Sequence, residues 1–239
     1  MIVDVAANPV YAYTGARAPA AAQPTVVFVH GAANDHSVWA LQSRWFAHHG
    51  WNVLAVDLPG HGRSGGAALA SVDAIADWLD SLLDAAGVER AALVGHSLGA
   101  LAALACAARH PARVTRIALI GPSVPMPVTD LLLAAAKADD HAAFELINGW
   151  SVSAGKQLGG NAVPGMWLTG NAMRLMERTR PGVLYTDLAA CNAYAEGLAH
   201  AAAVRAAQVL AHDVDRDAGH PGAHRRLAPV AREGLDGGD

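Results

Sequence analysis

The sequence predicts an α/β fold: a mostly parallel, doubly wound sheet with helices on both faces. From Thr25 onward, short β-branched runs alternate with helix-length amphipathic segments, and three such crossovers follow one another directly. Strand–helix–strand units of this kind place their strands side by side and parallel. The length of 239 residues favours one domain with an insertion over two full domains.

Four strands are expected in the first half of the chain. Their sequences are TVVFVHG from Thr25, WNVLAVDLPG from Trp51, RAALVG from Arg90 and VTRIALIG from Val114. The second strand should stop at Pro59-Gly60, because proline cannot donate to a strand ladder and glycine permits the turn.

Three helices are expected between these strands. The first, HSVWALQSRWFAHHG, carries Val38, Leu41, Trp45 and Phe46 on one apolar stripe. The second, SVDAIADWLDSLLDAAG, has Ser71 as its N-cap and an apolar stripe of its own. The third is SLGALAALACAARH, which follows the third strand directly.

The chain divides into a core at 1–124, a helical cap at 125–204 and a C-terminal segment at 205–239. Prolines after Gly121 mark a linker, and the sequence from there to Val204 is helical without a convincing strand. An insertion between strands is expected to cover the carboxyl edge of the sheet and to shape an apolar pocket. Its aromatic and methionine side chains could equally fill the core of the cap itself.

The segment after Arg205 has a different composition. From Ala206 onward it contains no aromatic residue, no isoleucine and no methionine, while glycine and charged residues are common. Such a segment buries little and is expected to be a weakly ordered tail or a remnant of the core. The abrupt change suggests a truncation or a change of reading frame in the gene.

Composition argues against several classes of function. The net charge of −4 and the lack of a Lys/Arg run disfavour nucleic acid as a partner. No apolar run approaches the roughly 20 residues of a membrane span, and the start lacks the pattern of a signal peptide, so a cytoplasmic protein is expected. Cys106 and Cys191 lack metal or redox spacing and are interpreted as packing residues, and no metal site or cofactor is expected.

The stretch ALVGHSLGALAAL places Ser97 between a strand and a helix. Gly95 and Gly99 are the residues that a sharp strand-to-helix turn requires, because larger side chains would collide with the adjacent strand and helix. The amino end of the following helix would favour negative charge beside the serine. The context therefore predicts a nucleophilic serine on a nucleophile elbow.

Two further segments, FVHGAANDHSVW and DLPGHGRS, together with this elbow, resemble the motifs of the α/β-hydrolase family. The resemblance covers Val26 to Asp213. Within the family, the sequence is similar to the branch of capped esterases, haloperoxidase-like enzymes and C–C bond hydrolases. The resemblance implies a cap after the sixth family strand, and an oxyanion hole formed by the N–H groups of Ala32 and Leu98. His30 and His96 lie within the motifs and are interpreted as scaffold. Branches that use an aspartate nucleophile fit less well, because Ser97 occupies that position.

The family's order of serine, acid and histidine is kept, but the spacing is not. Asp213, Asp215 and Asp217 are followed by His220, and the resemblance implies Asp215 as the acid and His220 as the base. A parallel crossover needs about 10 to 12 residues or more between them, which this segment does not offer.

Two functions from different classes remain open. One is a serine hydrolase that cleaves an ester or related activated carbonyl of a small, partly apolar substrate through an acyl-enzyme. The other is a binding protein or inactive relic without a complete triad. Within the enzyme class, C–C cleavage, acyl transfer and peracid formation are not distinguished by the sequence, and neither is the oligomeric state.

Overall fold

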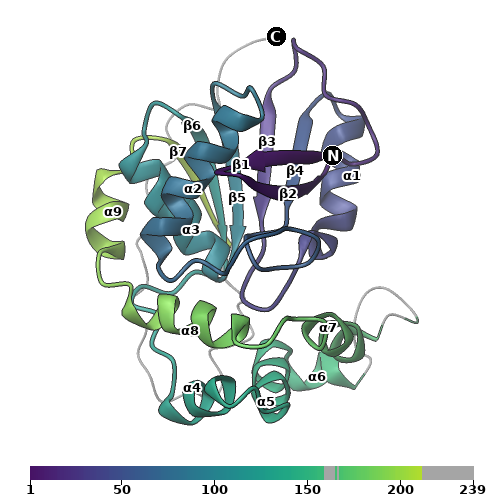
Figure 1. Cartoon of the computed structure of the whole chain (residues 1–239), viewed down its shortest axis with the longest axis vertical. Helices are drawn as coiled ribbons and strands as arrows, with labels where there is room; N and C mark the ends of the chain where they lie inside the picture. Colours follow the sequence, from purple (N-terminus) through teal and green to yellow (C-terminus); the bar gives the residue numbers. More distant parts are fainter. Residues whose placement is uncertain (159–164, 166, 212–239) are drawn as a thin grey trace.

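The computed structural model describes residues 1–158, 165 and 167–211. Its centre is a seven-stranded sheet in the order β1-β2-β4-β3-β5-β6-β7 (Figure 1). The strands are β1 Ile2–Val5, β2 Asn8–Tyr13, β3 Thr25–Val29, β4 Asn52–Val56, β5 Ala91–His96, β6 Val114–Ile120 and β7 Ala207–Ala211.

The sheet is parallel from β4 to β7, as the crossover pattern predicts. The pairs β3–β4, β3–β5, β5–β6 and β6–β7 are all parallel, whereas β1–β2 and β2–β4 are antiparallel. The four strands expected from Thr25 onward are therefore confirmed. The β1–β2 hairpin precedes them and was not expected from the sequence.

Ten helical segments connect the described strands. Four belong to the first half: the 3₁₀ turn η1 His36–Trp39, α1 Ala40–His48, α2 Val72–Ala85 and α3 Leu98–Arg109. The other six lie between β6 and β7 and are called the insert here: α4 Asp130–Lys137, α5 Ala142–Ser151, α6 Ala154–Gln157, α7 Leu168–Met176, α8 Val183–Ala193 and α9 Gly197–Ala203. Figure 1 shows α4 to α8 below the sheet, while α9 lies beside α3.

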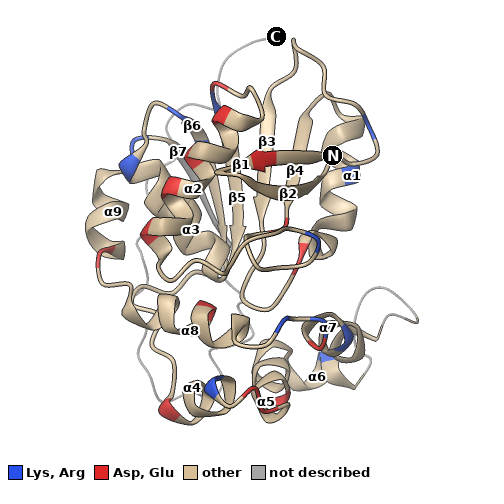
Figure 2. Ribbon diagram, in the orientation of Figure 1, with Lys and Arg blue, Asp and Glu red and all other residues tan. Residues whose placement is uncertain are grey.

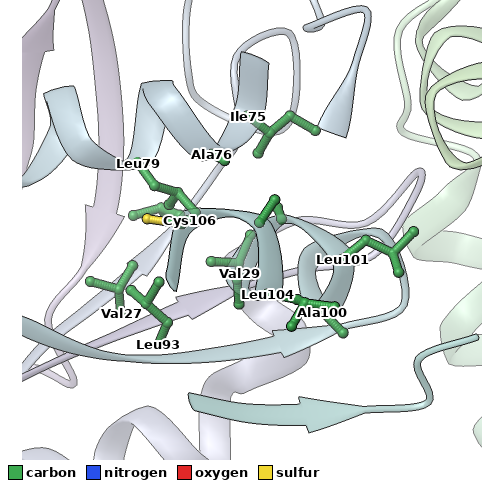
Figure 3. Close-up of a cluster of buried hydrophobic side chains, with 14 of the residues drawn as sticks. Val27, Val29, Ile75, Ala76, Leu79, Leu93, Ala100, Leu101, Leu104 and Cys106 are labelled. Carbon is green, nitrogen blue, oxygen red and sulfur yellow. The ribbon is translucent and has the colours of Figure 1, made fainter. Parts of the chain in front are cut away.

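Both faces of the sheet are buried, which confirms the doubly wound arrangement. Successive side chains of a strand point to opposite faces. In β3, Val27 and Val29 join the cluster formed with α2 and α3, part of which Figure 3 shows, while Val26 and Phe28 pack with Trp39 on the other face. Each large aliphatic or aromatic side chain buried in this way contributes roughly 1.5 to 3 kcal/mol.

The first two helices differ in how well their apolar stripes were predicted. Helix α2 begins as expected, because the Ser71 side chain accepts a hydrogen bond from the N–H of Ala74. The stripe expected on the first helix is wrong: Leu41 is 71% exposed and Trp45 is 55% exposed. The buried residues there include Trp39 and Ala47, because a 3₁₀ turn precedes α1 and a different set of positions faces the sheet.

The insert has an apolar cluster of its own, and that cluster includes a residue of the core. Ala33, from the loop after β3, is buried among Leu132, Ala136, Met176 and Leu184. Some of the aromatic residues are not in this cluster: Trp167, for example, is 68% exposed. In the part of the chain that the structure covers, no helix combines the length and apolar character needed to cross a membrane.

Strand β7 belongs to the segment that was expected to be a weakly ordered tail. Residues Ala207–Ala211 pair with β6 in parallel register, so the beginning of that segment is part of the sheet. Of the two alternatives, a tail does not describe these five positions, whereas a remnant of the core agrees with their pairing, because backbone pairing with β6 does not depend on large apolar side chains.

Charged residues are distributed over the whole molecule. Figure 2 shows Lys and Arg on elements of both the core and the insert, interspersed with Asp and Glu. Many of them pair at the surface, as Arg109 does with Asp77 at 2.7 Å. That nucleic acid is not a partner stays a prediction.

Candidate active site

Ser97 lies in a strained turn between β5 and α3. Its backbone angles are φ 53° and ψ −119°, in a region that residues other than glycine rarely adopt. The Ser97 N–H donates to the carbonyl oxygen of Ile120 at 3.0 Å, and its own carbonyl accepts from the N–H of Ala100 at 2.9 Å. The side chain is half-buried. The turn thus holds the hydroxyl at the carboxyl end of β5, against the first turn of α3.

The two glycines beside the serine are required by close backbone contacts. A Cβ atom at Gly95 would lie 2.1 Å from the carbonyl oxygen of Gly99, and one at Gly99 would lie 2.3 Å from that of Val29. Neither position can hold a side chain unless the backbone moves. The sharp turn predicted from the sequence is therefore present, for the steric reason given there.

The loop after β3 passes directly against the serine. A Cβ at Gly31 would lie 3.2 Å from Ser97 Cβ. Ala32 follows in this loop, and Leu98 follows Ser97 as the first residue of α3. Among the described residues, neither the Ala32 N–H nor the Leu98 N–H donates a hydrogen bond to another protein group. Two uncommitted N–H groups therefore occur on the two segments that meet at Ser97.

The buried His30 ties this loop to the loop after β4. Its Nδ1 donates to the carbonyl oxygen of Gly31 at 2.8 Å, and its Nε2 accepts from the N–H of Leu58 at 3.1 Å. This pattern defines the neutral tautomer with the proton on Nδ1. Burial, and then the neighbouring His61, lowers the pKa of His30 to about 4. With both nitrogens occupied, His30 supports the loop, in agreement with its interpretation as scaffold.

Asp57 organises the second motif segment, DLPGHGRS. Its Oδ1 accepts from the backbone N–H and from Nδ1 of His36, and its Oδ2 accepts from the N–H of Arg63. Burial opposes the charge, but these hydrogen bonds outweigh it and hold the pKa of Asp57 below its usual range. Asp35, His36 and Asp57 offer ligand atoms within 4.8 Å of one another and could hold a metal ion. The oxygens of Asp57 that would bind it already accept hydrogen bonds.

A second buried pair, His61 and Asp187, was not singled out from the sequence. His61 Nε2 lies 2.8 Å from Asp187 Oδ2, and both side chains are 2% exposed. The other ring nitrogen, Nδ1, lies 3.0 Å from the carbonyl oxygen of Pro59. Since a carboxylate and a carbonyl only accept hydrogen bonds, these two partners favour the protonated ring, in which both nitrogens donate. Burial disfavours this charge, but the hydrogen bond and charge of Asp187 outweigh burial and raise the pKa of His61.

Only some of the residues expected at the site can be located. Ser97, Leu98 and the loop that carries Ala32 come together at the end of β5 and β3. His220 and Asp215, with the neighbouring Asp213 and Asp217, lie outside the described residues. His96 is exposed, and its Nδ1 would lie 3.0 Å from a Cβ at Gly31.

A cavity lies among residues of the insert. It has a volume of about 150 Å³ and is lined by residues that include Ala136, Phe144, Thr179 and Leu184. Ser97 is not among the lining residues. This cavity is therefore separate from the serine.

A family model described as the alpha/beta hydrolase fold matches residues 24–147, just over half of the chain. The chain belongs to the α/β-hydrolase family. The matched region contains all three motif segments, including the turn at Ser97. In this α/β hydrolase the strand order and the parallel sheet agree with the family assignment.

Curated relatives match part of this α/β hydrolase. A 2-hydroxy-6-oxononadienedioate/2-hydroxy-6-oxononatrienedioate hydrolase of Paraburkholderia phymatum is 38% identical over 125 residues, which cover 47% of this chain and 43% of the relative. The lipase LipV of Mycobacterium tuberculosis is 37% identical over 101 residues, covering 41% of this chain and 37% of the lipase. The aligned part thus spans less than half the length of these relatives.

A solved structure matches over a longer part of the chain. The enol-lactonase from Burkholderia xenovorans LB400 superposes with a TM-score of 0.75 and 21% sequence identity, covering 88% of this chain and 80% of the lactonase. At this identity the similarity supports the fold and not the substrate.

Proposed function

We propose that this α/β hydrolase is a serine hydrolase in which Ser97 attacks an ester or a related activated carbonyl. The observation that carries the proposal is the strained turn of Ser97, which meets the Gly31 loop and the first turn of α3. The N–H groups of Ala32 and Leu98 then form the oxyanion hole, where each such donor contributes roughly 3 kcal/mol to the transition state.

The proposed chemistry proceeds in two steps. Ser97 Oγ forms a bond to the carbonyl carbon and gives its proton to a base, the ester C–O bond breaks, and the base protonates the leaving alkoxide. Water then attacks the acyl-enzyme, the bond to Ser97 breaks, and the acid product leaves while the serine regains its proton. We assign the base to His220 and its orienting acid to Asp215. Supporting this choice, His30 and His61 have both ring nitrogens engaged in hydrogen bonds.

The substrate class follows from the family and from the insert. We propose a small, partly apolar carbonyl compound, with the insert acting as a cap over the site. The relatives named above include a lipase and a hydrolase of 2-hydroxy-6-oxo dienedioates, so both an ester and a C–C bond next to a carbonyl are candidates. A cytoplasmic location stays part of the proposal.

The test compares wild type with Ser97→Ala on short-chain aryl esters and on a 2-hydroxy-6-oxo dienedioate. A loss of at least about 10³-fold in kcat for either substrate is expected. Ser81→Ala serves as the control, because Ser81 lies on α2 and its hydroxyl donates within that helix to the Asp77 carbonyl. Equal rates for wild type and Ser97→Ala would overturn the proposal.

A fluorophosphonate probe separates the hydrolase from the inactive alternative. Covalent labelling of wild type, absent in Ser97→Ala and retained in Ser81→Ala, indicates an activated serine. Folded wild-type protein that is not labelled and does not turn over would favour a binding protein without a working triad. His220→Ala and Asp215→Asn then test the assignment of base and acid by the loss of labelling rate.

A further inference from the structure

The insert holds both backbone polar groups of one residue in the loop after β3. The Ala33 N–H donates to Asp187 Oδ2 at 3.1 Å, and the Ala33 carbonyl accepts from the Thr179 hydroxyl at 3.1 Å. Ala33 is 1% exposed and has φ 54°, a left-handed conformation that is unfavourable for an alanine. An unfavourable conformation of this kind persists where its surroundings hold it in place.

Asp187 is itself fixed by charge. The oxygen that accepts from Ala33 also lies within hydrogen-bond distance of His61 Nε2, and His61 Nδ1 faces the Pro59 carbonyl. Asp187 belongs to α8 of the insert, whereas His61 belongs to the loop after β4. The ion pair therefore joins the insert to the core at the point where Ala33 is held.

Arg180 adds a further link between insert and core. Its Nη2 donates to the carbonyl oxygens of Gly62 at 3.3 Å and Ser64 at 3.0 Å. Together, Thr179, Arg180 and Asp187 engage both loops that carry the family motifs. None of the three was identified as a functional residue from the sequence.

The peptide between Gly31 and Ala32 is oriented by contacts within the core, and the peptide that follows it is held by the insert. The Gly31 carbonyl accepts from His30 Nδ1 at 2.8 Å and from the Asn34 N–H at 3.3 Å. In a planar trans peptide the N–H points opposite to the carbonyl, so these bonds direct the Ala32 N–H the other way. The next peptide is held as well, since the Ala32 carbonyl accepts from Asn34 Nδ2 and the Ala33 N–H donates to Asp187.

We propose that Asp187 and Thr179 are positioning residues for the oxyanion hole: docking of the insert fixes Ala33 and thereby holds the Ala32 N–H in place to receive the oxyanion. This inference rests on the proposed hydrolase function and adds to it a dependence of the chemical step on the insert. The two side chains act through the backbone of Ala33 and need not touch the substrate.

The test uses near-isosteric variants, so that folding is preserved. Thr179→Val removes the hydroxyl that donates to the Ala33 carbonyl. Asp187→Asn keeps an acceptor for the Ala33 N–H but loses the charge that holds His61, and Asp187→Ala loses both. The matched control is Thr186→Val, because Thr186 lies beside Asp187 in α8 and its hydroxyl donates only to the Gly182 carbonyl in the described part of the chain.

Rates are expressed per active site, counted by fluorophosphonate titration of Ser97. We expect kcat to fall about 10-fold in Thr179→Val and about 100-fold in Asp187→Ala, with Asp187→Asn between them. The KM of each variant should stay within about two-fold of wild type, because a misplaced donor weakens transition-state stabilisation more than it weakens substrate binding. Affinity for an arylboronic acid, which forms a tetrahedral adduct, should fall in parallel with kcat. Thr186→Val should match wild type.

The outcomes separate this inference from the proposed function. Wild type that neither turns over nor labels would remove the proposed function itself. Active wild type whose kcat and boronate affinity are unchanged in Thr179→Val and Asp187→Ala would overturn the inference alone. A lower melting temperature with unchanged kcat per titrated site would assign these residues to stability only.

Discussion

The ring centroids of His30 and His61 lie 4.9 Å apart in the interior, and the pKa values of the two rings shift in opposite directions. His30 accepts from the Leu58 N–H, which favours its neutral form, whereas His61 faces the Pro59 carbonyl and the Asp187 carboxylate, which favour its protonated form. The difference arises from hydrogen-bond partners and not from depth, since both residues are buried.

This contrast can be observed directly by ¹⁵N NMR of the histidine rings. We expect His30 to remain in its Nδ1–H neutral form until the pH approaches about 4, because burial and the nearby His61 charge lower its pKa. His61 should instead be an imidazolium at pH 6.5, where exposed histidines are half titrated. Both signals titrating near pH 6.5 would contradict the assignment.

His30 should also make the fold acid-sensitive. Its folded pKa of about 4 lies below the ordinary 6.5, so the unfolded chain binds the proton more tightly between these values. Stability from this group is present above pH 6.5 and declines as pH falls toward 4. The decline contributed by His30 from pH 8 to pH 5 should be about 2 kcal/mol, measured as the difference between the urea-unfolding profiles of wild type and His30→Asn, because the raised pKa of His61 acts in the opposite direction in both proteins. A difference that does not change with pH over that range would contradict it.

His61 has the opposite dependence, and Asp187→Asn should reveal it. Because the folded pKa of His61 is raised, its stabilisation is complete below the unfolded value of 6.5 and is lost as pH rises through the folded pKa. The groups that act on it are Asp187, Asp57 and His30. We expect Asp187→Asn to be about 3 kcal/mol less stable than wild type at pH 6, with a gap that narrows toward pH 9. Thr186→Val should show no such pH dependence.

The turn at Ser97 should tolerate no side chain at Gly99. A Cβ there meets the Val29 carbonyl oxygen at 2.3 Å, so Gly99→Ala should cost about 3 kcal/mol and abolish labelling of Ser97. Gly149→Ala is the matched control: Gly149 lies in α5 with nothing within 4 Å of the new Cβ. In that helix interior, alanine should be more stabilising than glycine by up to about 1 kcal/mol. Equal stability of the two variants would contradict the steric argument.

The two cysteines should not react with thiol reagents in the native protein. Cys106 and Cys191 are free and buried, and burial raises the pKa of each thiol to about 12. Since the thiolate is the reactive form, a colorimetric disulfide reagent should modify neither residue until urea unfolds the chain. Modification of the native protein at the rate of an exposed thiol would exclude this packing.

Much of the core could be predicted because its signals are local. The strands β3 to β6, the N-cap at Ser71 and the glycines around Ser97 follow from periodicity, capping and steric limits within a few residues. The exposed face of α1 could not be predicted, because the stripe of residues that faces the sheet depends on where the preceding 3₁₀ turn ends. The places of β2 and β7 in the sheet likewise depend on pairing with strands that are distant in sequence.

The sequence by itself determined the parallel sheet, the turn at Ser97 and membership in a family. Tertiary structure alone decided how the site's loop is held, since Thr179 and Asp187 reach Ala33 from a part of the chain far away in sequence. It also decided the opposite pKa shifts of His30 and His61, which the residue type leaves open. The physical reason is that burial and hydrogen-bond partners set both conformation and pKa, and these exist only once distant segments meet.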